Sequence, residues 1–322
     1  MRYVEYVNER IRARLTEVER VVMFGENIAA GSCIGGLTRG LPNHGDRLIL
    51  NTPNVENTQV GVGFGLMLSG VSSILFLKQQ DFLLLSMDHL VNTHNFVRLS
   101  PPRASFTIVA VVVDLGYQGI QSSLNNFGDF CSMGRVPGYA IANRHDADGT
   151  IHRHLVAPGF RIIGVSQRLF NTEILECDAE PVVDTEGAIF QYSQGEDATI
   201  VALNFSFPQA LTLQRDLKEH GLRASLFSVN AALPVDWSRI MRDVGRTGRA
   251  VILDDSKSAH RACYHLAATI YQECRHVERV LVLARQSTDA LLCPNPEEFV
   301  VDRDAVLREL TGKLASGISE RP

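Results

Sequence analysis

The sequence has 322 residues with 31 basic and 36 acidic side chains, so its formal net charge is −5 and its length fits about two domains. Ordinary fractions of hydrophobic (45%) and charged (21%) residues exclude a disordered, collagen-like or coiled-coil chain. The chain is mildly acidic and has no Lys/Arg cluster, and no apolar run reaches the roughly 18 residues that cross a bilayer. We therefore expect neither nucleic acid nor a membrane as a partner.

The cysteines and the beginning of the chain indicate a compartment. Six cysteines form no CxxC pair: Cys33, Cys131, Cys177, Cys263, Cys274 and Cys293. Free thiols are typical of a reducing compartment. The opening segment MRYVEYVNERIRARL carries charges throughout and does not resemble a signal peptide. We expect a cytoplasmic protein.

The first part of the chain alternates helical and extended patterns. Apolar residues at helical spacing, beginning with Val4, Val7 and Ile11, predict an amphipathic helix over residues 3–18. Further helices are expected at residues 55–70 and 82–98, and strands at 21–24, 47–51, 73–77, 107–114 and 160–165. The strand pattern TIVAVVVD is a continuous β-branched run, typical of a strand covered on both faces. This alternation predicts a parallel α/β sheet.

Two stretches interrupt the alternation. Residues 115–154 contain six glycines and little apolar periodicity, which predicts a long structureless segment, and residues 178–197 are expected to be a linker. The alternation then restarts, with strands expected at 199–204, 223–229, 250–254 and 277–283 and helices at 209–220, 236–245 and 259–273. We therefore expect two α/β domains, at residues 1–180 and 195–322, of which the second is smaller.

Few short motifs point to chemistry. The sequence contains no GxxxxGK[ST], HExxH or GxSxG motif. His152 and His154 have no third ligand at a metal-binding spacing, so we expect polar loop histidines. Asp254 and Asp255 end a predicted strand, where carboxylates occur in α/β sites but more commonly face solvent.

Glu56 is the carboxylate with the most informative surroundings. It lies where a predicted strand ends and an apolar, glycine-rich helix begins. A carboxylic acid at the mouth of a close-packed apolar helix is partly desolvated, so it can hold or donate a proton at neutral pH. The alternative is a carboxylate that only complements the dipole at the helix N-terminus.

Segments spread over nearly the whole chain carry a family resemblance. In chain order they are the opening helix with its GEN strand end, NTPNVENTQVGVGFGLMLSG, KQQDFLLLSMDHLVN, APGFRIIGVS, ATIVALNFSFPQAL, GRAVILDDSKSAH and ALLCPNPEEF. They resemble the β subunit of the first, thiamine diphosphate-dependent component of 2-oxoacid dehydrogenases, and more broadly the C-terminal half of transketolases. The resemblance implies a pyrimidine-binding domain, with a parallel sheet flanked by helices, followed by a smaller transketolase-type C-terminal α/β domain.

The resemblance also implies a cofactor site. Glu56 would hydrogen-bond N1′ of the aminopyrimidine of thiamine diphosphate and so activate the cofactor for attack on a carbonyl carbon. Glu26 would lie near the same ring. Phe76 and Phe82 would line the aminopyrimidine pocket, with ordinary core packing as the alternative. Gln79 takes the position of a ring-stacking aromatic.

One half of the expected site has no counterpart in the sequence. The superfamily holds the diphosphate and its metal with a GDG motif followed by an Asn pair, and this chain contains no GDG. The resemblance therefore implies that this chain binds no metal itself, and that an α-type subunit supplies the diphosphate and Mg²⁺ half in an α2β2 heterotetramer. A lipoyl acyltransferase is a further partner where lipoamide is the acceptor.

The family histidine has two placements in this sequence. Either Gln121 occupies its position or His145 does, and we favour His145 as an acid–base or substrate-binding group. Three functions remain open. The expected one is the β-like subunit of an enzyme that cleaves or forms a C–C bond next to the carbonyl of a 2-oxoacid. The others are a ketol transferase or carboligase of a specialised pathway, and a non-catalytic scaffold for an α-type chain.

Overall fold

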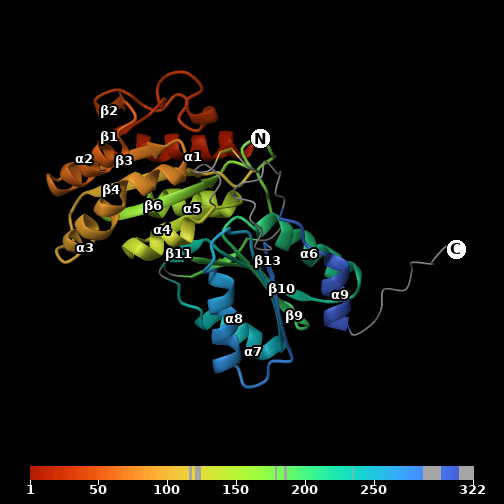
Figure 1. The fold of residues 1–322 in the computed structure, drawn as a ribbon. Coiled ribbons are helices and arrows are strands. Elements are labelled where there is room, and N and C mark those ends of the chain that lie inside the picture. The colour runs from red at the N-terminus through yellow and green to blue at the C-terminus, as the bar shows by residue number, and fades with distance from the viewer. Residues whose placement is uncertain are drawn as a thin grey trace.

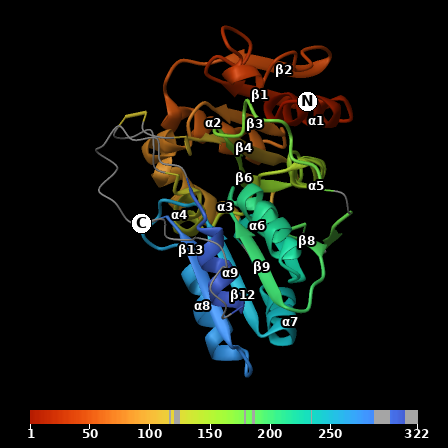
Figure 2. The ribbon, with the colours of Figure 1, turned by 90° about the vertical axis from the view of Figure 1, so that its right-hand side faces the viewer.

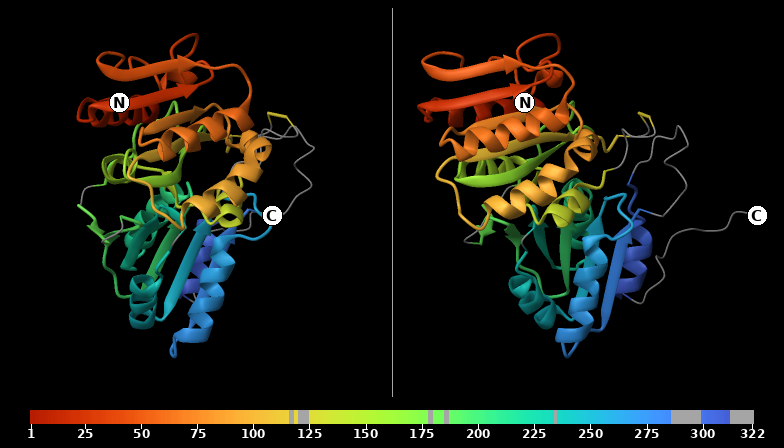
Figure 3. Two further views of the ribbon diagram at one scale, coloured as in Figure 1. Left: turned by 90° about the vertical axis from the view of Figure 1, so that its left-hand side faces the viewer. Right: turned by 60° about the vertical axis from the view of Figure 1, so that its left-hand side comes forward.

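The computed structural model describes residues 1–115, 118–119, 125–177, 180–184, 187–233, 235–285 and 299–311. These residues form two β-sheets, each flanked by helices (Figure 1). Figure 2 and Figure 3 show the first sheet with its helices above the second sheet with its helices. We call these two parts of the structure the first layer and the second layer. No helix of the described segments is long and apolar enough to cross a bilayer.

The first sheet has seven strands in the order β11-β5-β6-β4-β3-β1-β2. Its strands are β1 (Arg20–Gly25), β2 (Asp46–Asn51), β3 (Ser73–Leu77), β4 (Ser105–Val112), β5 (Gly138–Ile141), β6 (Gly159–Ser166) and β11 (Ala231–Leu233). The pairs from β5 to β2 are all parallel, whereas β11 pairs antiparallel with β5. The carboxyl ends of the parallel strands therefore lie on one side of the sheet, which we call its common edge.

The second sheet has the order β13-β12-β9-β10-β8-β7. Its strands are β7 (Val182–Val183), β8 (Ile189–Ser193), β9 (Ala198–Leu203), β10 (Ala224–Val229), β12 (Arg249–Asp254) and β13 (Arg279–Ala284). The four strands β9, β10, β12 and β13 pair in parallel, and β8 pairs antiparallel with β10. Both sheets are thus predominantly parallel, and the α/β fold class predicted from the sequence is confirmed.

The helices that cover the sheets follow the expected alternation. They are α1 (Tyr3–Thr16), α2 (Glu56–Leu68), α3 (His94–Val97), α4 (Phe127–Gly134), α5 (Arg144–His154), α6 (Phe207–Glu219), α7 (Ser238–Thr247), α8 (Ala262–Glu273) and α9 (Arg303–Thr311). The single helix expected at residues 82–98 is instead a succession of short turns: the 3₁₀ helix η2 (Gln80–Ser86), the π-type η3 (His89–Thr93) and α3.

The first sheet has a hydrophobic core on each face because side chains alternate along a strand. On β3, Ile74 and Phe76 join the cluster that includes α1 and α5, while Leu75 and Leu77 join the cluster that includes α2 and α4. Every residue of this strand is buried, which agrees with a parallel strand covered on both faces.

The segment 115–154, expected to be structureless, contains regular elements in its described part. It forms α4, β5 and α5, of which β5 is only four residues long. The sequence RHDADGTIHRH of α5 is mostly polar, so it gives no apolar period, and its helix is stabilised by contacts with α1 and β5. The structureless prediction was therefore wrong because tertiary contacts outweigh a weak local pattern.

The segment expected to be a linker also contains strands. Within residues 178–197, β7 and β8 add to the second sheet at its edge. The two layers are further connected by β11, which follows the second-layer strand β10 in sequence but pairs with β5 of the first sheet. The boundaries proposed at residues 180 and 195 thus run close to a region where the layers share strands.

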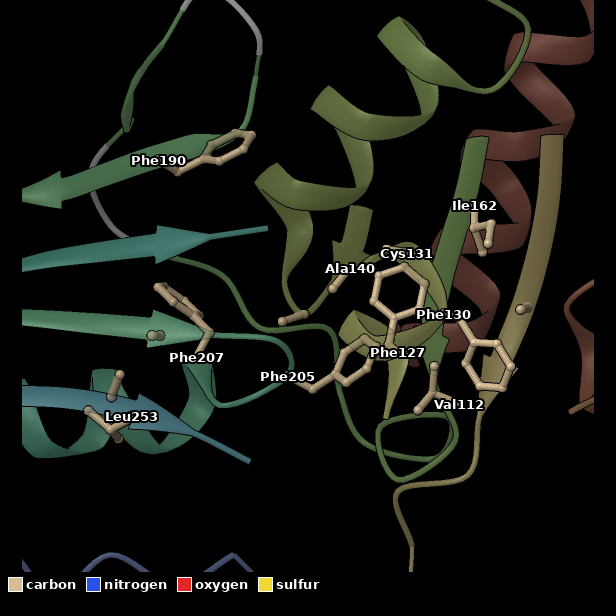
Figure 4. Packing of buried hydrophobic residues seen from close by; sticks show 14 of the residues in the cluster. Val112, Phe127, Phe130, Cys131, Ala140, Ile162, Phe190, Phe205, Phe207 and Leu253 are labelled. Atoms are coloured by element: carbon tan, nitrogen blue, oxygen red, sulfur yellow. The ribbon is translucent and has the colours of Figure 1, made fainter. Parts of the chain in front are cut away.

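Aromatic side chains fill the junction between the layers. Phe127 of α4 and Phe205, which follows β9, approach one another there (Figure 4). A side chain at Gly164 of β6 would lie 3.3 Å from Phe127 and 3.4 Å from Phe205. Both rings therefore pack against the backbone of the first sheet, and the largest hydrophobic core is shared by both layers.

Candidate functional site

The common edge of the first sheet gathers charged side chains from three neighbouring strands. Glu26 follows β1, the turn after β2 leads to Glu56, and Lys78 follows β3. The register places Gly25 beside Asn51 on one side and beside Phe76 on the other. Parallel pairing therefore brings these three chain ends together although they are far apart in sequence.

Gly25 allows Glu26 to lie close to β3. Its φ angle is +147°, a region that favours glycine, and a Cβ atom at this position would lie 2.2 Å from the carbonyl oxygen of Phe76. Any other residue would clash with the backbone of β3. The glycine before Glu26 is thus required by the close approach of the two strands.

The turn between β2 and α2 is held by amide side chains. Asn51 Oδ1 accepts hydrogen bonds from the backbone N–H groups of Ile28 (2.9 Å) and Ala29 (3.0 Å), which ties the loop after Glu26 to the end of β2. Gln59 Nε2 donates to Thr52 Oγ1 (2.7 Å) and to the carbonyl oxygen of Pro53 (2.9 Å). These bonds fix the first turn of α2 and with it Glu56.

Glu26 and Glu56 form a buried carboxyl pair. They are 7% and 5% exposed. Burial raises the pKa of Glu26, and the negative charge of Glu56 raises that pKa further. Glu26 Oε1 is buried and accepts no hydrogen bond from any donor of the described residues. A buried carboxyl group beside a second acidic side chain holds its proton more readily than an exposed one, so Glu26 can keep a proton at this place.

Lys78 is the cation next to this pair, and the sequence analysis did not identify it. Its Nζ atom lies 3.8 Å from Glu26 Oε2 and 5.8 Å from the centre of the Phe82 ring. The ammonium lowers the pKa of Glu26, which opposes the effects of burial and of Glu56. A lysine directly after a buried strand that ends at the candidate edge was the available sequence signal.

The aromatic and glutamine side chains that were predicted to lie near the cofactor differ in position. Phe82 lies beside Lys78 at this edge, and Gln79 is the residue before η2. Phe76 is fully buried in the cluster with α1 and α5, so this side chain is core here, and its role in a pocket stays a prediction. Gln121 lies outside the described residues.

His145 is not brought to the carboxyl pair within this chain. It lies in the first turn of α5, after β5, and the sheet order separates β5 from β1 by four strand spacings, or about 19 Å. Its Nδ1 atom is 3.6 Å from Glu180 Oε2, and it lines a cavity of about 400 Å³ together with Cys177. A catalytic role for His145 stays a prediction.

The pair Asp254 and Asp255 is buried, so the expectation of surface carboxylates was wrong. Both side chains are fully buried, and Asp255 contacts Arg168 across the two layers at 3.0 Å. Arg168 Nε also lies 3.5 Å from Asp114 Oδ2. We call Asp114, Arg168 and Asp255 the interlayer ion cluster. The cluster links the two sheets, and this structural role explains why its carboxylates are buried.

The described residues contain no group of three or more His, Cys, Asp and Glu side chains that could hold a metal. His152 and His154 take part in no such group, and His154 instead stacks on Tyr139 with 3.9 Å between ring centres. The cysteines of the described segments are free, and Cys293 lies outside them. A cavity of about 990 Å³ lies between α4, α8 and the ends of β9 and β10, and its lining contains neither Glu26 nor Glu56.

Two comparisons of fold define the class of this chain. It matches a solved structure described as "Split gene transketolase, inactive beta4 tetramer" with a TM-score of 0.69 and 14% identity over 88% of this chain and 89% of that chain. It matches a transketolase from Campylobacter jejuni with a TM-score of 0.65 and 11% identity, covering 88% of this chain and 42% of that chain. The fold is therefore of the transketolase type.

Sequence comparisons identify a family model and named proteins to which this chain is similar. Residues 187–291 match the family model "Transketolase, C-terminal domain". The chain is 21% identical to a pyruvate dehydrogenase E1 component subunit beta from Acholeplasma laidlawii, over 84% of each chain. It is 22% identical to the beta subunit of an acetoin:2,6-dichlorophenolindophenol oxidoreductase from Cupriavidus necator, over 83% of this chain and 82% of that protein. It is 20% identical to a 2-oxoisovalerate dehydrogenase subunit beta from Bacillus subtilis, over 85% of each. The resemblance to β subunits of 2-oxoacid dehydrogenase first components is confirmed.

Proposed function

We propose that this chain is the β-like subunit of a thiamine diphosphate-dependent enzyme that cleaves or forms a C–C bond next to the carbonyl of a 2-oxoacid. The observation that carries the proposal is the buried Glu26–Glu56 pair at the edge of a transketolase-type sheet. The names of three relatives, which concern pyruvate, acetoin and 2-oxoisovalerate, support a small oxo or hydroxy-oxo substrate. The proposed location is the cytoplasm.

The residues at the edge fit the aminopyrimidine part of the cofactor. An aminopyrimidine offers ring nitrogens and an amino group that donates hydrogen bonds, and the buried Glu26 Oε1 lacks a donor among the described residues. Glu56 would hold ring nitrogen N1′, with Glu26 close to the same ring. When bound, the cofactor supplies a carbanion equivalent and an electron sink.

In this proposal, the chain's own residues hold and position a proton. Gln59 holds the turn that precedes Glu56, and Asn51 ties the loop after Glu26 to the end of β2, so the backbone on both sides of the pair is held in place. Exclusion of water strengthens each electrostatic interaction of the pair. A protonated carboxyl at this place donates to a ring nitrogen, and a carboxylate accepts the proton back.

We also propose that the site is completed by an α-type chain in a heterotetramer. This chain lacks the GDG motif, so the diphosphate and Mg²⁺ would be held by that partner. Large apolar side chains are exposed on elements beside the pair, among them Val62 and Leu68 of α2 and Leu85 of η2. Exposed apolar groups on neighbouring elements favour a protein interface. The split-gene transketolase in the β4 form is inactive, which agrees with this proposal.

The test is a reconstitution with an α-type chain carrying the GDG motif. The pair is assayed with pyruvate or 2-oxoisovalerate as donor, and with lipoamide or an aldehyde as acceptor. Glu56→Gln is expected to lower kcat at least 100-fold without loss of assembly, because it removes the ionisable group. The matched control is Glu219→Gln on the exposed end of α6, which should keep full activity. Unchanged turnover of Glu56→Gln, or no donor consumption at all, contradicts the proposal.

A further inference from the structure

Lys78 has a position that neither core packing nor an ordinary surface ion pair explains. Its side chain is 42% exposed, while the carboxyl group it faces, that of Glu26, is 8% exposed. The 3.8 Å separation between Nζ and Oε2 is longer than a normal hydrogen bond, so the contact acts through charge. The ring of Phe82 lies 5.8 Å from the same ammonium and adds a second attraction.

Two charged side chains of the described residues act on Glu26. Glu56 faces it from the first turn of α2, and Lys78 faces it from the turn after β3. A negative charge beside a buried carboxyl group disfavours its ionised form, and a cation beside it favours that form. The ammonium of Lys78 therefore lowers the pKa of Glu26, against the effects of burial and of Glu56.

We propose that Lys78 is a positioning residue that holds the buried Glu26 carboxyl group in its ionised form through the charge contact between Nζ and Oε2. Its ammonium contacts Glu26 Oε2, the carboxyl oxygen nearest to it. The effect on the chain itself does not depend on the cofactor. Its consequence for catalysis rests on the proposed function, because an aminopyrimidine bound at this place would contact the same carboxyl groups.

The choice of lysine agrees with this role. A guanidinium would offer a planar fork and could bind both oxygens of Glu26, whereas an ammonium acts as a compact point charge. The long exposed stem also lets the charge adjust when a ligand enters. Removing the charge should therefore change proton uptake by Glu26 and leave the buried packing of β3 intact.

The direct test is a pH titration of the full chain labelled with ¹³C at the glutamate side-chain carboxyl carbon. The variants Glu26→Gln and Glu56→Gln identify the signals of the pair. In Lys78→Met, the midpoint for proton uptake by Glu26 should move upward by about one pH unit. This is the low end of the range for an opposite charge at this distance because the ammonium is partly exposed. Lys78→Arg should retain most of the original midpoint.

Lys218→Met is the matched control, because Lys218 is an exposed lysine of α6 remote from the pair. It should leave the midpoint unchanged. A midpoint in Lys78→Met that stays within about 0.2 pH unit of the native value overturns the proposal. Should Lys78→Met fail to fold by circular dichroism, Lys78→Gln replaces it in the same titration.

The titration separates this proposal from the proposed function. It uses the chain without cofactor, so it succeeds or fails independently of turnover. In the reconstituted enzyme, the acidic limb of the pH profile of kcat/KM should move in the same direction as the titration midpoint in Lys78→Met. A shifted midpoint with an inactive native enzyme keeps the role of Lys78 on the pair and rejects the cofactor assignment. An unshifted midpoint in an active enzyme rejects the role of Lys78 and keeps the cofactor assignment.

Discussion

Replacing Arg168 with Met tests how the two layers are held together. Arg168 Nη2 donates to Asp255 Oδ2 and to the carbonyl oxygen of Phe205, both at 3.0 Å. Its Nε atom lies 3.5 Å from Asp114 Oδ2. Both carboxyl groups are fully buried, so Met would leave two negative charges without their shared cation.

The magnitude follows from that burial. Removing one partner of a buried ion pair costs about 3–5 kcal/mol of the free energy of unfolding, because the remaining charge stays desolvated. Asp114 keeps hydrogen bonds from Ser166 Oγ and from the backbone N–H of Arg168, which moderates the cost. We therefore expect a loss of about 4 kcal/mol at pH 8.

The loss should depend on pH. Burial raises the pKa of Asp255 to about 6, while Arg168 lowers it. A carboxyl group whose pKa is raised in the folded chain favours folding most at low pH, and this advantage is lost as pH rises through about 6. Without Arg168 the pKa of Asp255 rises further, and a protonated Asp255 needs no cation. The cost of Arg168→Met should therefore be smaller at pH 5 than at pH 8.

Urea unfolding at both pH values measures this cost. Far-ultraviolet circular dichroism follows the whole chain, and the fluorescence of Trp237, the single tryptophan, follows the second layer. Arg223→Met is the control, because Arg223 and Glu196 form an exposed ion pair and should contribute less than about 1 kcal/mol. A loss below about 1 kcal/mol at pH 8, or an equal loss at both pH values, refutes the role of the cluster.

Two further substitutions test packing and buried charge. A Cβ atom at Gly63 of α2 would lie 2.2 Å from the ring of Phe106, so Gly63→Ala should destabilise the chain by about 1–3 kcal/mol. A Cβ atom at Gly65 meets open space, so Gly65→Ala should be neutral or stabilising. Thermal unfolding measures both variants. Burial raises the pKa of Asp146 from 3.8 to about 7, so its contribution to stability falls as pH rises through that range, by up to about 4 kcal/mol. In urea unfolding, Asp146→Asn should remove this part of the pH dependence, and an unchanged slope between pH 4 and pH 7 would contradict it.

Strong local patterns made much of the first layer predictable. The helix predicted at residues 3–18 corresponds to α1, and the strand predicted at 73–77 agrees with β3 at both ends. Such segments have a clear apolar period or a continuous apolar run. Glu56 was identifiable for a similar reason, since the change from strand to apolar helix is visible in the sequence.

Weak local patterns hid other elements. The four-residue strand β5 and the polar helix α5 owe their structure to neighbours in the sheet and to α1. β8 pairs antiparallel with β10, and β11 with β5, and of these four strands only β10 was predicted from the sequence. Pairing partners distant in sequence leave no local signal, so only the folded chain reveals them.

The sequence by itself determined the α/β alternation, the position of Glu56 at a strand-to-helix turn and the absence of a GDG motif. The tertiary structure decided which charges meet. Lys78 and Glu26 come from separate strands, and Arg168 and Asp255 come from separate layers. Burial of these groups depends on everything packed around them, and electrostatic interactions become strong only where water is excluded. The sequence gives the charge of each residue, but only the folded structure gives its neighbours and its burial.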